Sequence, residues 1–174
     1  MQSLPISLCM IVRNEAAHLP ATLRSVRDAV AEMIVVDTGS TDGTASVAEQ
    51  WGARVRRTVW ADDFSAARNL SLTEAKEPWI LMLDGDERLA DGSGPRLQEL
   101  VRAPADVVAY LVQQRTPTRS SAQNGMVRLE WLPRLFRNGQ GARYTGAVHE
   151  CILPSLAGRG RIEHTDLVIE HDGY

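Results

Sequence analysis

The sequence predicts an α/β fold in which a mostly parallel sheet is flanked by helices, followed by a more irregular, mixed second half. Two observations support this prediction. Short apolar runs alternate with segments of helical periodicity through the first half, which is typical of parallel strands joined by right-handed crossovers. The run at 79–83 is apolar throughout and too short for a helix, which is typical of a strand buried on both faces, and it stops abruptly on acidic residues. The 174 residues, 44% of them hydrophobic, indicate one domain over 1–174.

The first half, residues 1–89, is expected to be the nucleotide-binding part of the domain. Leu19, Leu23, Val26 and Val30 recur at helical spacing and predict a helix over 15–31. The opening apolar run lacks a preceding positive charge and a small-residue cleavage site, so it is interpreted as a first strand rather than a signal peptide. The expected strands are 6–12, 33–37, 54–59 and 79–83, and the other expected helices end near residue 50 and span 64–75.

The second half, residues 90–174, is expected to complete the site and to receive the acceptor. A polar loop over 116–125 suits a lid or acceptor loop. Trp79 and Trp131 are assigned to the core, with stacking on a ligand as an alternative for Trp131. The expected elements are a helix at 96–101 and strands at 107–114, 127–132, 135–137, 148–153 and 167–170.

Composition excludes several classes of protein. A formal net charge of −3 argues against a nucleic-acid binder. Nine arginines lie between residues 102 and 161 against three acids, so this half either faces an anionic partner or balances an acidic first half. Cys9 and Cys151 have no CxxC spacing and are expected to be free thiols in a reducing compartment. No apolar run approaches the ~20 residues of a membrane span.

Asp84-Gly85-Asp86 directly follows the run at 79–83. In open α/β sheets ligands bind at the carboxyl edge of the strands, so carboxylates placed there suit a divalent metal or a polar substrate. Gly85 is expected to allow a sharp turn. A plain polar turn is the alternative. A calcium loop of EF-hand type is excluded, because Arg88 and Leu89 stand where that loop needs an oxygen ligand and a glycine.

A second acid, Asp37, ends the strand at 33–37 and precedes a glycine-rich turn. It is assigned to a ligand, as a hydrogen-bond acceptor for a base or ribose, whereas Asp42 is interpreted as a helix cap. The turn matches neither GxGxxG nor a phosphate-binding P-loop. Asn14 and Glu15 suit either the start of a helix or a ligand. Arg68 suits a pairing with Asp84, a phosphate or an ordinary surface position.

Taken together and in order, these motifs resemble family 2 glycosyltransferases with the GT-A fold. The later motifs resemble the bacterial branch that contains lipopolysaccharide-core glucosyltransferases and tetratricopeptide-linked transferases. The resemblance covers nearly the whole chain. It rests on Arg13-Asn14-Glu15, the turn at 35–44, Ala67-Arg68-Asn69, Leu83-Asp84-Gly85-Asp86-Glu87, Leu135-Phe136-Arg137-Asn138, Gly146-Ala147-Val148-His149-Glu150 and His171-Asp172-Gly173-Tyr174.

The resemblance implies a role for individual residues. Asp86 matches the carboxylate that coordinates Mg²⁺ or Mn²⁺, and His171 falls where a further metal or diphosphate ligand is often found. Glu150 lies where the family places an acidic catalytic base, although the pair here is His149-Glu150 rather than Glu-Asp. An ordinary structural role is the alternative for each. The implied nucleotide-binding residues are Arg13, Glu15, Asp37, Arg68 and Asp84.

The implied activity is metal-dependent, inverting transfer of a sugar from a nucleoside-diphosphate-sugar to an acceptor hydroxyl in bacterial cell-surface glycan synthesis. The acceptor would be a glycan, a lipid-linked molecule or a protein, and the enzyme would be cytoplasmic, with peripheral contact to the anionic inner face of the membrane. A non-catalytic nucleotide-sugar-binding module is the alternative. A haloacid-dehalogenase-type phosphohydrolase is disfavoured, because it needs a lysine downstream of the acids and the only lysine is Lys76.

The sequence also departs from the family. Thr38 stands where many members have a second aspartate, and no Gln-x-x-Arg-Trp motif follows Glu150, so a processive synthase is not expected. The sequence stops at Tyr174, soon after His171. A compact or excised catalytic domain without its C-terminal acceptor region is therefore expected.

Overall fold

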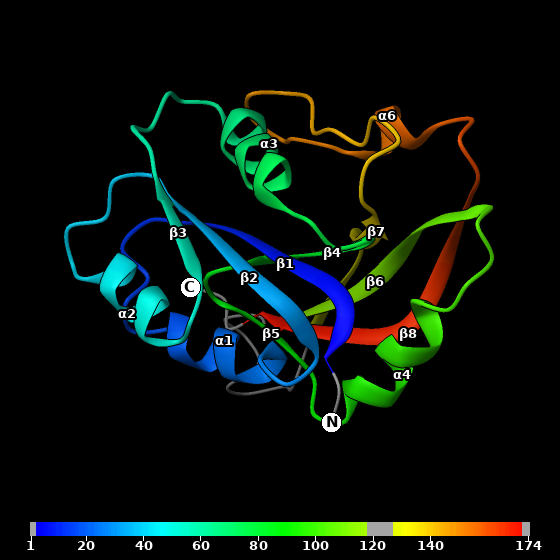
Figure 1. The fold of residues 1–174 in the computed structure, drawn as a ribbon, viewed down its shortest axis with the longest axis horizontal. Coiled ribbons are helices and arrows are strands. Elements are labelled where there is room, and N and C mark those ends of the chain that lie inside the picture. Colours follow the sequence, from blue (N-terminus) through cyan, green and yellow to red (C-terminus); the bar gives the residue numbers. More distant parts are fainter. Residues whose placement is uncertain (1–2, 118–126, 172–174) are drawn as a thin grey trace.

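A computed structural model describes residues 3–117 and 127–171, which form one mixed sheet (Figure 1). The described strands follow the order β3-β2-β1-β4-β7-β6-β8-β5. The first four in this order are mutually parallel. Their carboxyl ends therefore lie along one edge of the sheet. They are β1 Leu4–Val12, β2 Val30–Asp37, β3 Arg54–Arg57 and β4 Trp79–Asp84.

The strands of the second half extend this sheet with mixed directions. β7 runs antiparallel to both β4 and β6, while β8 is parallel to β6 and antiparallel to β5. The expected α/β class, with a parallel first half and a mixed second half, is confirmed. The four strands are β5 Glu87–Leu89, β6 Val107–Pro117, β7 Val127–Arg137 and β8 Arg161–His171.

Helices cover both faces of the sheet (Figure 1). α1, α2 and α4 lie on one side, and α3 and the short α6 lie on the other. No helix among the described residues combines the length and the apolar character needed to cross a bilayer. The helices are α1 Leu19–Val26, α2 Thr44–Gln50, α3 Phe64–Glu74, α4 Ser93–Leu100 and α6 Leu153–Leu156.

β1 lies between β2 and β4 and contributes to the apolar core on both faces of the sheet. Its successive side chains point to opposite faces, as in any strand. Leu8 belongs to the apolar cluster that contains Leu23 of α1, whereas its neighbour Cys9 belongs to the cluster that contains Ile80 and Tyr144. The strand is therefore buried on both faces, as its continuous apolar run predicts.

The first helix is shorter than expected. It begins at Leu19 with Pro20 in its first turn, a position that suits proline because the amide there has no partner within the helix. The predicted helical roles of Asn14 and Glu15 are wrong, because the helix cap is His18. The helix ends at Val26, and Val30 begins β2 instead. The prediction included Val30 in the helix because its spacing fits a helix as well as a strand.

The second half differs more from expectation. The runs 127–132 and 135–137 form the single strand β7, in which Pro133 pairs with Leu111 at a register shift where β7 has one residue more than β6. The predicted strand at 148–153 is wrong: His149 has a left-handed backbone (φ 57°), and α6 begins at Leu153. Trp79 is core, but Trp131 is 43% exposed, so its assignment to the core is wrong. In the predicted loop over 116–125, β6 continues to Pro117 and the remainder lies outside the described residues.

Candidate active site

The carboxyl ends of β1 and β4 border a cleft of about 290 Å³. Most of the residues assigned to the site from the sequence lie around it. Asp37 and His171 are the two exceptions, and Asp37 borders a separate hollow of about 200 Å³ with the turn that follows β2. His171 does not line the cleft, but it contacts Asp86, which does. The predicted residues that line the cleft are Arg13, Glu15, Arg68, Asp84, Asp86 and Glu150.

Arg68 on α3 connects two of the acids in the cleft. Its Nη2 lies 2.8 Å from Asp84 Oδ1, and its Nε donates to Glu150 Oε1 at 2.7 Å. The side chain is only 7% exposed, so the interpretation of Arg68 as a surface arginine is wrong. Arg68 therefore fixes the carboxylate at the end of β4 relative to Glu150.

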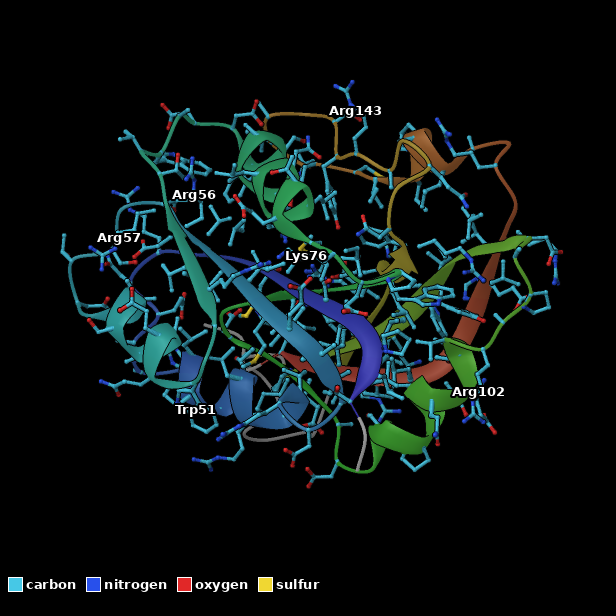
Figure 2. All side chains as sticks on the ribbon, in the orientation of Figure 1. Trp51, Arg56, Arg57, Lys76, Arg102 and Arg143 are labelled. Carbon is cyan, nitrogen blue, oxygen red and sulfur yellow. The ribbon has the colours of Figure 1, made fainter. Side chains whose placement is uncertain are left out.

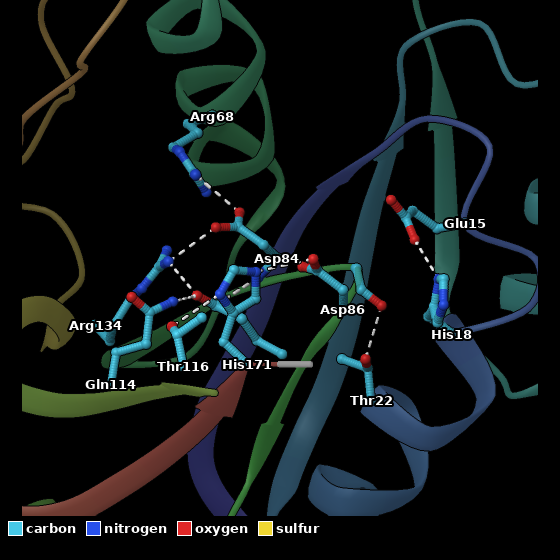
Figure 3. A network of polar contacts seen from close by, with 12 residues as sticks. Glu15, His18, Thr22, Arg68, Asp84, Asp86, Gln114, Thr116, Arg134 and His171 are labelled. Atoms are coloured by element: carbon cyan, nitrogen blue, oxygen red, sulfur yellow. Dashed lines mark hydrogen bonds and ion pairs between the residues drawn. The ribbon is translucent and has the colours of Figure 1, made fainter. Parts of the chain in front are cut away.

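Arg134 on β7 is a site residue that sequence reasoning missed (Figure 3). Its Nη2 donates to Asp84 Oδ2 at 2.8 Å and also to Glu87 Oε1, to which Gln114 donates as well. The Asp84 amide donates to the other Glu87 oxygen at 2.8 Å. The available signal was an arginine within an apolar strand segment, since a buried charge needs a partner.

The two guanidinium groups control the charge at the end of β4. Burial raises the pKa of Asp84, but Arg68 and Arg134 outweigh it and hold that pKa well below its usual range. Burial raises the pKa of Glu87, and Arg134 opposes this rise. Among the described residues, Arg68 Nη1 has no hydrogen-bond partner. An unsatisfied buried donor costs about 1–3 kcal/mol, so an oxyanion entering beside Arg68 would relieve that cost.

Asp86 and His171 form the second polar contact of the cleft. The imidazole Nε2 lies 2.9 Å from Asp86 Oδ2, and Thr116 Oγ1 lies 3.0 Å from Nδ1 (Figure 3). The β5–β8 pairing brings His171 opposite Glu87, one residue after Asp86. The histidine is therefore oriented from both sides.

Asp86 supplies the kind of ligand that a hard divalent cation takes, because Mg²⁺ and Mn²⁺ prefer carboxylate oxygens. His171 Nε2 lies 2.9 Å from this carboxylate, a hydrogen-bond distance, so the imidazole would join the coordination shell only by giving up that contact. The described residues contain no cluster of three or more His, Cys, Asp or Glu side chains able to hold a metal. Mg²⁺ commonly uses one or two protein ligands and completes its shell with substrate phosphates and water.

Gly85 is needed for a reason other than the expected turn. Its backbone is not in the left-handed region, but a Cβ at this position would lie 2.7 Å from Glu15 Cγ. Thr22 Oγ1 also donates to the Gly85 carbonyl at 2.8 Å. The absence of a side chain therefore lets Glu15 pack directly against the turn that carries Asp86.

The turns after β1 and β2 hold each other. Asn14 Oδ1 accepts from the Thr41 amide at 2.8 Å, and the Glu15 amide donates to Thr44 Oγ1 at 2.8 Å. Asp37 Oδ1 accepts from the amides of its own turn at 2.8 and 3.0 Å. The prediction that Asp42 caps the following helix is wrong, because the cap of α2 is Gly43, although Asp42 Oδ1 accepts from the Thr44 amide at 3.1 Å. These contacts give one wall of the cleft a fixed shape.

Comparison with known proteins identifies the family. Residues 7–159 match the model of Glycosyl transferase family 2. The chain belongs to this family. The family 2 chain is 44% identical over 151 residues to a TPR repeat-containing protein of Synechococcus elongatus, covering 87% of this chain and 36% of that protein. It is 31% identical over 166 residues to LpsC, a lipopolysaccharide core biosynthesis glycosyltransferase of Rhizobium meliloti, covering 87% and 58%.

Solved structures share the fold of this family 2 chain. S. aureus TarS, residues 1–349 in complex with UDP-GlcNAc, superimposes with a TM-score of 0.76 at 14% identity over 98% of this chain and 60% of that one. The mannosyltransferase PcManGT of Pyrobaculum calidifontis, in complex with GDP-Man and Mn²⁺, gives 0.72 at 15% identity over 98% and 57%. The GT-A fold expected from the resemblance is confirmed. The chain spans 36% and 58% of the lengths of the two relatives named above.

Proposed function

We propose that this chain is a catalytic domain that moves a sugar from a nucleoside-diphosphate-sugar to an acceptor hydroxyl with the help of Mg²⁺ or Mn²⁺. The observation that carries the proposal is the meeting of two polar units in one cleft. One is the Asp86–His171 pair, and the other is Arg68 between Asp84 and Glu150. The solved structures of the same fold, TarS with UDP-GlcNAc and PcManGT with GDP-Man and Mn²⁺, support a nucleoside-diphosphate-sugar as the donor.

The donor would lie along the carboxyl edge of β1, β2 and β4. Residues 1–89 would bind the nucleotide through Arg13, Glu15, Asp37, Arg68 and Asp84. Asp86 and His171 would hold the cation, which supplies positive charge to neutralise the departing diphosphate. Thr116 would orient the imidazole, as partners of metal-binding histidines do.

Residues 90–174 would contribute the chemistry on the acceptor side. Glu150 lines the cleft, and Arg68 Nε fixes one of its oxygens. It would take the proton of the acceptor hydroxyl while that oxygen bonds to the anomeric carbon and the carbon–phosphate oxygen bond breaks. A single displacement of this kind inverts the anomeric configuration. General base catalysis contributes roughly 10²- to 10⁴-fold.

The biological setting proposed is bacterial cell-surface glycan synthesis in the cytoplasm, at the inner face of the membrane. The similarity to LpsC supports it. The arginines of the second half give less support for an anionic surface than their number suggests. Arg134 and Arg137 bind partners inside the fold, and Arg161 pairs with Asp106. Arg102 and Arg143 project from well-separated parts of the molecule (Figure 2).

Two measurements test the proposal. Thermal shift with UDP or GDP, with and without Mn²⁺, should show stabilisation that needs the cation in the wild type and loses this dependence in Asp86→Asn. Asp91→Asn, an exposed aspartate outside the cleft, is the matched control. Hydrolysis of UDP- and GDP-hexoses with Mn²⁺ should fall in Asp86→Asn. Equal turnover in both proteins would contradict the metal assignment.

Glu150→Gln separates the base from the nucleotide site. The variant should bind UDP or GDP with Mn²⁺ as the wild type does, yet transfer the sugar roughly 10²- to 10⁴-fold more slowly. Unchanged transfer would exclude Glu150 as the base. Nucleotide binding by the wild type without hydrolysis or transfer would favour the non-catalytic binding module.

A further inference from the structure

Two aromatic side chains border the mouth of the cleft. Trp60 and Phe64 line it together with Asp86 and Glu150. Their rings meet edge to face, with centroids 4.7 Å apart and an interplanar angle of 67°. Phe64 is nevertheless 39% exposed, and Val59 beside Trp60 is 87% exposed. Apolar surface left open beside a carboxylate-lined cleft is typical of a ligand site.

The indole of Trp60 is already oriented and its polar atom is satisfied. Nε1 donates to Asp62 Oδ1 at 2.8 Å. Asp62 has a left-handed backbone (φ 54°), a conformation that aspartate tolerates, and Asp63 then caps α3 by accepting from the Ala66 amide at 2.9 Å. The ring therefore offers a ligand its apolar surface rather than a hydrogen-bond donor.

The loop that carries Glu150 is bound to the same end of α3. The Phe64 amide donates to the Ala147 carbonyl at 3.0 Å, and Arg68, one turn further along the helix, holds Glu150. Val148 lies between these two attachment points and is 63% exposed. A ligand resting on the aromatic pair would therefore lie next to the carboxylate of Glu150.

We propose that Trp60 and Phe64 form a platform for the acceptor, and that the acceptor presents a neutral hexopyranose. This inference rests on the proposed function and names its acceptor class. The C–H bonds on the face of a pyranose carry slight positive charge and are attracted to the negative face of an aromatic ring. The ring hydroxyls then point outward from the edge of the sugar, where Glu150 can accept a proton.

The charges at this mouth favour a neutral sugar over an anionic acceptor. Two arginines, Arg13 and Arg68, line the cleft against the four carboxylates of Glu15, Asp84, Asp86 and Glu150, and Arg68 is already paired with Asp84 and Glu150. Asp62 and Asp63, which lie between Trp60 and Phe64 in the chain, add two further negative charges. An acceptor carrying phosphate or carboxylate at the reacting sugar would meet this negative charge directly.

Saturation-transfer NMR tests the platform on the protein with UDP and Mg²⁺ bound. The probes are methyl glycosides of β-D-glucose, β-D-galactose and N-acetyl-β-D-glucosamine. At least one should receive saturation at its ring C–H protons, with the signal reduced five-fold or more in Trp60→Ala and in Phe64→Leu. Trp131→Ala is the matched control, because Trp131 is also exposed but packs edge to face against His164 outside the cleft.

Three outcomes would overturn the platform: no glycoside signal in the wild type, an undiminished signal in Trp60→Ala, or an equal loss in the Trp131 control. If Trp60→Ala instead abolished the saturation-transfer signal at the base protons of UDP and left the glycoside signal intact, the indole ring would be assigned to the donor. Failure of UDP to bind with Mg²⁺ in the wild type would count against the proposed function. In that case the glycoside signal would be compared between the wild type and the two variants without UDP, and the same reduction in Trp60→Ala and Phe64→Leu would be expected.

Discussion

Replacing Arg134 by alanine should destabilise the domain more than loss of a surface arginine does. Arg134 is 8% exposed and neutralises Glu87, which is completely buried, as well as Asp84. Removing one partner of a buried ion pair costs about 3–5 kcal/mol, because the other charge stays buried. For a domain of this size about 1 kcal/mol corresponds to about 2–4 °C, so the melting temperature should fall by about 6–20 °C.

Arg128→Ala is the matched control on the same strand. Arg128 is 66% exposed and pairs with Glu130, which is 38% exposed, so its loss should cost about 0–1 kcal/mol. Both variants would be compared with the wild type by thermal denaturation and by urea unfolding. Adding Glu87→Gln to Arg134→Ala should recover part of the stability, because it removes the uncompensated charge. A loss no larger than that of the control, or no recovery, would refute the reasoning.

Two further predictions concern groups away from the cleft. Burial raises the pKa of Glu32, but a hydrogen bond from the Ser7 hydroxyl and further donors lower it below its ordinary value of 4.5. The folded state therefore holds this proton less tightly than the unfolded chain, and stability should fall as the pH drops below about 4.5. Glu32→Gln should flatten that fall in urea unfolding measured from pH 3 to 7. Burial raises the pKa of Cys9 to about 12, so iodoacetamide at pH 8 should label Cys151 in the native protein and Cys9 only after denaturation, as mass spectrometry would show.

The first half of the fold was predictable because its strands are buried on both faces. Such strands carry continuous apolar runs, and the motifs follow directly at their carboxyl ends. The second half was less predictable where tertiary pairing overrides local signals. Pro133 reads as a strand break, yet it fits a register shift, and the strand-like run at 148–153 contains a left-handed residue and the start of a helix. β5 has only three residues, too few for a periodic pattern.

The site shows the same division. Its strand-end acids could be assigned from the sequence, and the structure places Asp84 and Asp86 at the cleft with Arg68. For Arg134 the apolar run around it indicated burial, but its partners could not be assigned, because they depend on the antiparallel pairing of β7 with β4. Trp60 could not be assigned either, because a tryptophan in a connecting loop has no periodic signal. Its position depends on the conformation of that loop.

The contacts that complete the cleft join residues far apart in the chain. Asp86 and His171 are 85 positions apart, and Arg68 and Glu150 are 82 apart. Contacts between such distant residues form slowly, because a long segment must be ordered before they can stabilise it. During synthesis the acids at the end of β4 leave the ribosome long before the histidine and the glutamate that meet them. Affinity for a nucleotide and its cation should therefore arise late in folding, once β8 has paired with β5.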